Sequence, residues 1–77
     1  MRIKVTQEHI DKGVSGDMCA CPVALAIEER IGERPVVWGL IIKVKDVEQY
    51  VAAPVGVFIS RFDEGLSVKP FSFNLKI

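Results

Sequence analysis

Apolar and polar residues alternate at both ends of the chain. Near the start, Ile3 and Val5 alternate with three polar residues, Arg2, Lys4 and Thr6. Near the end, the apolar positions are Phe71, Phe73, Leu75 and Ile77, and the polar positions between them are Ser72, Asn74 and Lys76. A period of two is typical of a strand with one buried and one exposed face. The pattern therefore predicts terminal strands at residues 2–6 and 71–77.

The centre of the chain holds its most strongly strand-forming segment. Residues 36–44 are rich in β-branched and aromatic side chains. The even-numbered positions form an unbroken apolar face: Val36, Trp38, Leu40, Ile42 and Val44. One long strand is therefore predicted here, with its odd-numbered residues outward. Residues 47–52 are predicted to return beside it, after a turn near Lys45 and Asp46.

Three helices are predicted from their end signals and apolar spacing. Thr6 can cap a short helix at 7–12 that stops at Gly13, and Cys21 can cap a second that begins at Pro22 and ends at Gly32. A third runs from residue 54 to Gly65. Its apolar stripe has helical spacing, i, i+3, i+4 and i+7: Val55, Phe58, Ile59 and Phe62.

These elements follow the order β-α-α-β-β-α-β. The 77 residues suffice for one domain and are too few for two, so residues 1–77 are taken as a single domain. The order predicts an α+β fold with a four-stranded, mostly antiparallel sheet and the helices on one face.

The composition predicts a second buried surface. Apolar residues make up 49% of the chain, which is more than a small monomer easily hides. Val37, Gly39 and Ile41 occupy the outer register of the long strand, so self-association through this strand is expected, giving a homodimer. No apolar run approaches the roughly 20 residues that span a bilayer, and no leader pattern opens the chain, so we expect a cytoplasmic protein without a membrane partner.

Two stretches resemble a group of short uncharacterised proteins of bacteriophages and bacteria. The first combines residues 5–10, Val-Thr-Gln-Glu-His-Ile, with Gly13, with Gly16-Asp17 and with residues 21–26, Cys-Pro-Val-Ala-Leu-Ala. The second is a phenylalanine-isoleucine helix that ends in the turn Arg-Phe-Asp-Glu-Gly at 61–65, before a Pro-Phe strand. The group has no established activity, so the resemblance implies a phage or prophage accessory protein and supplies no functional residues.

Charge is the one feature that points to a binding surface. Ten basic and ten acidic residues balance, so only their distribution is informative. Half of the basic residues fall on the predicted outer sheet face: Arg2, Lys4, Lys43, Lys45 and Lys76. Tyr50 is predicted to lie on the same face. This face is predicted to bind an anionic partner, with Arg30 on the helical side contributing much less. The alternative is a solvated face whose lysines prevent edge-to-edge aggregation.

The cysteines and the single histidine allow two further interpretations. Cys21 precedes a helix, where a thiolate can be stabilised, so Cys19 and Cys21 could support minor thiol-redox chemistry. The competing interpretation is a small buried side chain under the helix start. His9 and Asp17 could join both cysteines in a metal site, but the spacing is not that of a zinc site, and we expect His9 on the exposed side of its helix.

Other catalytic patterns find little support. Gly13 and Gly16 could form the GxxG loop of a KH domain, but basic neighbours are sparse and a tight turn is the simpler interpretation. The chain has no nucleophile elbow, P-loop or catalytic triad pattern. The leading hypothesis is therefore a non-enzymatic macromolecular interaction module without metal or cofactor, whose partner is a protein or a second copy. The alternatives are a nucleic-acid-associated protein and a thiol-redox protein.

Overall fold

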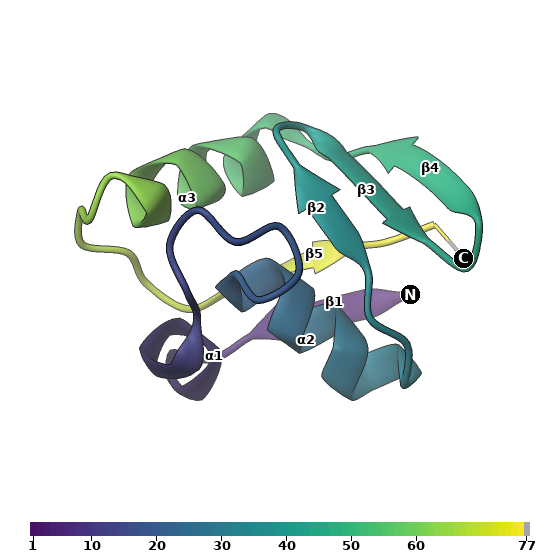
Figure 1. The fold of residues 1–77 in the computed structure, drawn as a ribbon, viewed down its shortest axis with the longest axis horizontal. Coiled ribbons are helices and arrows are strands. Elements are labelled where there is room, and N and C mark those ends of the chain that lie inside the picture. Colours follow the sequence, from purple (N-terminus) through teal and green to yellow (C-terminus); the bar gives the residue numbers. More distant parts are fainter. Residues whose placement is uncertain (77) are drawn as a thin grey trace.

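The computed structural model describes residues 1–76 and confirms the α+β class (Figure 1). The predicted position of Ile77 on the last strand lies outside the described residues. The elements, in chain order, are β1 (Arg2–Val5), α1 (Gln7–Lys12), α2 (Pro22–Ile31), β2 (Val36–Trp38), β3 (Ile41–Val44), β4 (Val47–Tyr50), α3 (Ala53–Asp63) and β5 (Phe71–Asn74).

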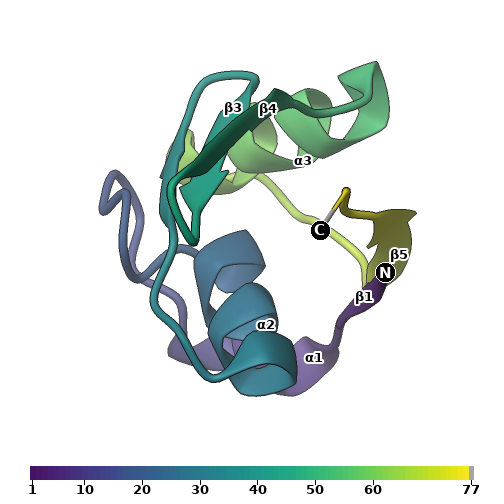
Figure 2. The ribbon, with the colours of Figure 1, turned by 90° about the vertical axis from the view of Figure 1, so that its right-hand side faces the viewer.

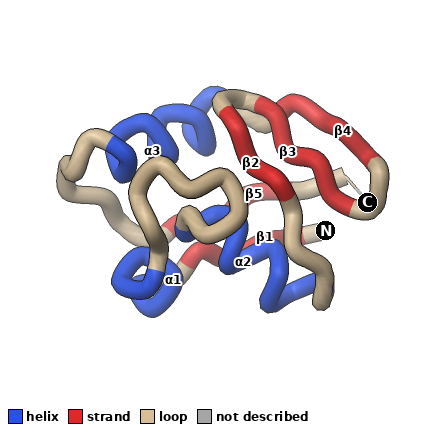
Figure 3. The backbone as a smooth tube through the Cα atoms, in the orientation of Figure 1, coloured by secondary structure: helices blue, strands red, loops and turns tan. Residues whose placement is uncertain are grey.

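The strands form two sheets, so the prediction of one four-stranded sheet is wrong. β1 pairs with β5 in an antiparallel two-stranded sheet, and β2, β3 and β4 form an antiparallel three-stranded sheet (Figure 3). The helices do not share one face either. Figure 2 shows α1 and α2 on one side of the molecule and α3 on the opposite side.

The predicted long strand is divided by a turn at Gly39 and Leu40. Gly39 has φ +60°, a left-handed conformation that glycine adopts without steric cost. Because the chain reverses there, the two halves of the segment bury opposite registers. Val37 is 3% exposed in β2, against the outward position predicted for it, whereas Trp38 and Leu40 are 36% and 49% exposed. Ile42 and Val44 of β3 are buried, as predicted.

The second turn of the three-stranded sheet is a tight two-residue hairpin. Val44 lies opposite Val47, and the residues between them, Lys45 and Asp46, have φ +52° and +61°. Two positive φ angles are the signature of a type I′ turn, which usually contains Asn-Gly. The turn therefore lies where it was predicted, near Lys45 and Asp46. For these two residues, unlike glycine, the left-handed conformation is sterically unfavourable.

The end signals predicted for the first two helices are confirmed. The Thr6 hydroxyl accepts from the His9 backbone N–H, the Cys21 sulfur accepts from the Ala24 N–H, and Gly32 ends α2 with φ +88°. α3 begins beside Pro54 without a side-chain cap and buries Val55 and Phe58 of the predicted stripe. None of the helices in the described chain is long and apolar enough to cross a membrane.

The core lies between the two sheets and α2. Its α2 side chains contact both β1 and β2, while β3, β5 and α3 complete the enclosure. The most completely buried large side chains are Ile3, Ile27, Ile42 and Leu75. Burial of the first turns of α2 confirms the prediction from its uniformly apolar start.

A side chain links the two sheets at one edge. The Gln49 amide of β4 donates to the Lys76 carbonyl at 2.7 Å and accepts from the Lys76 N–H at 2.8 Å. The amide thereby forms the same pair of bonds that a neighbouring strand would form with the backbone. This link fixes the chain after β5 against the three-stranded sheet.

Candidate functional site

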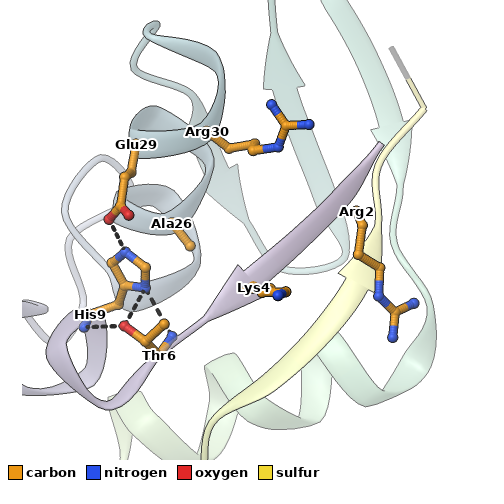
Figure 4. A pocket seen from close by; sticks show the side chains of 7 residues that line it. All are labelled: Arg2, Lys4, Thr6, His9, Ala26, Glu29 and Arg30. Atoms are coloured by element: carbon orange, nitrogen blue, oxygen red, sulfur yellow. Dashed lines mark hydrogen bonds and ion pairs between the residues drawn. The ribbon is translucent and has the colours of Figure 1, made fainter.

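A surface hollow of about 590 Å³ lies between β1 and α2. We call it the basic hollow. Figure 4 shows its seven lining residues, which come from β1, the cap and third position of α1, and the middle and last turns of α2. They are Arg2, Lys4, Thr6, His9, Ala26, Glu29 and Arg30.

Three cationic side chains reach this hollow because of strand and helix periodicity. Arg2 and Lys4 point away from the core because they alternate with the buried Ile3 and Val5 of β1. Arg30 lies in the last turn of α2, on its solvent side. Arg2 donates to the Asn74 Oδ1 at 3.3 Å, and within residues 1–76 neither Lys4 nor Arg30 forms an ion pair. Both charges are therefore available to a ligand.

The single carboxylate of the hollow is held by the buried histidine. His9 is 6% exposed, and its Nε2 lies 2.6 Å from Glu29 Oε2. The Thr6 backbone N–H donates to His9 Nδ1 at 2.9 Å, so Nδ1 is an acceptor and Nε2 carries the hydrogen given to Glu29. The prediction of an exposed His9 is wrong because this side chain completes the cap of α1.

Thr6, His9 and Glu29 form a line of side chains similar to a catalytic triad. The Thr6 hydroxyl lies 3.0 Å from His9 Nδ1, and Glu29 lies at the other ring nitrogen. A general base needs a free lone pair for the hydroxyl proton. The lone pair of Nδ1 already accepts the Thr6 backbone N–H. The line of side chains is therefore a helix cap tied to α2, and it provides no activated nucleophile.

The charge balance of the basic hollow is positive. Its lining contains three side-chain cations and one carboxylate, and that carboxylate is bonded to His9. The Thr6 hydroxyl adds a neutral group that can donate or accept. Guanidinium groups bind phosphate and carboxylate oxygens with two parallel hydrogen bonds, so this set of donors suits an oxyanion.

The cysteine region has the geometry of a structural element. Cys21 is 4% exposed, and burial raises the pKa of its thiol, with only a partial opposing effect from the backbone N–H groups at the start of α2. A raised pKa is the reverse of what a reactive thiolate requires. Asp17 Oδ1 accepts the backbone N–H groups of Cys19 and Ala20, so its carboxylate shapes the loop. Among residues 1–76, no three His, Cys, Asp or Glu side chains gather as a metal site would require.

The glycine-containing loop after α1 is attached to α3. The Gly16 N–H donates to Asp63 Oδ1 at 2.9 Å, and the Ser15 hydroxyl lies 3.2 Å from the carbonyls of Phe62 and Asp63. The loop therefore binds a carboxylate of the same chain, whereas the loop of a KH domain binds the phosphates of a nucleic acid. Gly16, with φ +75°, agrees with the interpretation as a turn residue. Gly13 is extended, and a Cβ atom there would lie 2.6 Å from the Pro22 ring, so it permits a close approach.

The structure divides the predicted basic face between the two sheets. Arg2 and Lys4 lie in the basic hollow, whereas Lys43 lies on β3, Lys45 in the hairpin turn and Tyr50 on β4, where it is 81% exposed. Lys76 follows β5 and is exposed. The six residues therefore do not form one sheet face, because the sheet predicted to hold them is two sheets.

Arg30 also lies elsewhere than the sequence predicted. It lines the same hollow as Lys4, although we expected it on the opposite side of the domain. Ala26, Glu29 and Arg30 have the spacing i, i+3, i+4 of one helix face, which is visible in the sequence. The packing of α2 beside β1 decides which strand this helix face contacts. The sequence carries no local signal for that packing.

Comparisons with family models, with curated proteins and with solved structures find no match for this chain.

Proposed function

We propose that this protein is a small, non-enzymatic interaction module that binds the phosphate groups of a nucleic acid in the basic hollow. The observation that carries the proposal is that Arg2, Lys4 and Arg30 all line one hollow, whose only carboxylate is bonded to His9 (Figure 4). The resemblance of two stretches of the sequence to phage and bacterial proteins supports a role as a phage or prophage accessory protein.

Phosphate is the ligand group that this set of donors suits best. Two arginines offer forked N–H donors, and Lys4 adds an ammonium charge. Contacts of this kind are made to the backbone of the nucleic acid and carry no sequence information. Binding should therefore be insensitive to sequence and strongly dependent on salt.

Salt dependence is the first test. A fluorescently labelled duplex is titrated with the protein at several salt concentrations, and the anisotropy gives the dissociation constant. Three phosphate contacts predict a slope of about −2.7 for log K against log salt on duplex DNA. A protein that binds no nucleic acid at low salt would contradict the proposal. Binding to poly-glutamate without binding to nucleic acid would instead assign the hollow to an acidic protein.

Charge-neutralising variants localise the site. The variant Lys4→Gln, Arg30→Gln should weaken binding and reduce the slope by about 2, because two phosphate contacts are lost. The matched control is Lys43→Gln, Lys45→Gln, which removes the same charge from the other sheet. The control should change the slope much less. Equal effects of both pairs would point to diffuse attraction by net charge.

Self-association is a second candidate function. β4 is one of the two outer strands of the three-stranded sheet, and its Tyr50 and Val47 are 81% and 42% exposed. An outer strand with exposed large side chains can pair with the same strand of a second copy. Light scattering after size exclusion tests this: a mass twice 8.5 kDa supports a dimer, and a monomer of 8.5 kDa at high micromolar concentration contradicts it.

A further inference from the structure

The basic hollow is the first of three hollows that share lining residues. A second, of about 420 Å³, shares Lys4 and Thr6 with it, and we call this the middle hollow. A third, of about 380 Å³, shares Pro70 and Phe71 with the middle hollow, and we call this the aromatic hollow. The shared residues make the three hollows neighbours, in the order α2, then β1 and the start of β5, then α3. We call this row of hollows the path.

The aromatic hollow differs from the basic hollow in its walls. α3 supplies Val57 and Phe58, and the segment before β5 supplies Val68. Val57 is 57% exposed and Phe71 is partly exposed, so these two side chains are open to a ligand, whereas Phe58 is buried beside Phe71, with ring centroids 4.6 Å apart. This hollow is large enough for a flat ring to lie against apolar and aromatic side chains.

The rim of the aromatic hollow is cationic. Arg61 and Lys69 line it, and Arg61 is oriented by a bond to the Ser67 carbonyl at 3.1 Å. Among the described residues that line the three hollows, Glu29 is the only carboxylate. Five cations lie along the same path: Arg2, Lys4, Arg30, Arg61 and Lys69.

We infer that this path binds a single-stranded nucleic acid, with its phosphates along the cations and one unpaired base in the aromatic hollow. The inference rests on the proposed function and extends it. Proteins that bind single strands combine a basic groove along the backbone with apolar or aromatic surfaces for the bases. The bases of a duplex are paired and stacked on one another, so none of them can enter the aromatic hollow.

The experiment compares a single strand with the duplex of the same length. The molecule is 30 Å in its longest dimension, so a labelled oligothymidine of about 12 nucleotides exceeds the path, and its duplex with oligoadenosine is the comparison. The single strand should bind about ten-fold more tightly at the same salt concentration. Lys69→Gln should reduce the salt slope for the single strand by about 0.7 and leave the slope for the duplex unchanged.

The variant Val57→Glu tests the aromatic hollow directly. It places a carboxylate on the exposed apolar wall and should weaken single-strand binding about ten-fold without changing duplex binding. Val14→Glu is the matched control, because Val14 is 52% exposed and lines none of the three hollows. Circular dichroism melting checks that both variants fold. If Val57→Glu does not fold, the effect of Lys69→Gln and the comparison of single strand with duplex test the path instead.

The outcomes separate the two proposals. Tighter binding of the single strand, lost in Val57→Glu and kept in Val14→Glu, supports the path. Duplex binding that equals or exceeds single-strand binding, with no effect of Val57→Glu, overturns the path and leaves phosphate binding in the basic hollow intact. Absence of binding to either oligonucleotide overturns the proposed function and the path together.

Discussion

The two sheets use different information to align their strands. In the β1–β5 sheet, the registers follow the alternation: Ile3 lies opposite Phe73 on the buried face, and Lys4 lies opposite Ser72 on the exposed face. In the β2–β3–β4 sheet, the alignment follows two turns with positive φ angles, at Gly39 and at Lys45-Asp46. A pattern of faces specifies a register only where one face is buried and the other is polar, and otherwise turn geometry decides.

The largest expected effect comes from the buried face of the β1–β5 sheet. Ile3 is 0% exposed, so Ile3→Ala should leave a cavity and lower the free energy of unfolding by about 2–5 kcal/mol, measured by denaturant titration. Val47→Ala on the outer strand of the other sheet should change it by less than about 0.5 kcal/mol. Similar losses from both would contradict the placement of Ile3 in the core and of Val47 at the surface.

Gly39 tests the turn that divides the central segment. Gly39→Val places a β-branched residue at φ +60° and should cost about 1–2 kcal/mol of unfolding free energy. Gly39→Asn is the control, because asparagine tolerates the left-handed conformation, and it should recover most of the loss. If valine is as stable as asparagine at this position, the turn is not what fixes the registers of β2 and β3.

The amide link between the sheets is expected to have a smaller effect. Gln49→Ala removes both bonds to Lys76 and should cost about 1 kcal/mol, since exposed hydrogen bonds contribute modestly. Amide hydrogen exchange at Lys76 should become faster, while exchange at Val44 should not change. Protection of Lys76 that persists in Gln49→Ala would show that the β1–β5 sheet alone orders this segment.

The hairpin turn should allow a small gain. Replacing Lys45 and Asp46 by Asn-Gly supplies the residues that a type I′ turn favours and should raise the unfolding free energy by about 0.5–1 kcal/mol. Thermal denaturation measures the change. A loss of stability would mean that the Lys45 or Asp46 side chain makes a contribution that outweighs the strain of its backbone.

The difference between the two sheets also explains which strands and helices could be predicted from the sequence. Alternation at residues 2–6 and 71–77 predicted β1 and β5, which are shorter, at Arg2–Val5 and Phe71–Asn74. End signals such as Thr6, Cys21 and Gly32 predicted α1 and α2. The prediction of one long strand at residues 36–44 was wrong for a physical reason. Residues 36–42 contain no polar side chain, so the pattern does not show which face is buried, and Gly39 in the middle is compatible with a strand as well as with a turn.

The candidate site was predictable only in part. The alternation identified Arg2 and Lys4 as exposed, because a residue's face in a strand follows from its neighbours. Arg30, Arg61 and Lys69 join them through the packing of two helices and a loop around β1 and β5. The path therefore depends on tertiary contacts between segments that are remote in the sequence, and no local pattern encodes such contacts.

The pairing of β1 with β5 has a consequence for the rate of folding. Arg2 and Asn74, which lie opposite each other, are separated by 72 positions, whereas the β3–β4 hairpin is closed by two residues. Closing the longer loop costs chain entropy before its contacts form. We therefore expect the hairpin and the helices to form early and the β1–β5 sheet to close in the rate-limiting step. Ile3→Ala should then slow folding, whereas faster unfolding at an unchanged folding rate would mean that the β1–β5 sheet closes after the transition state.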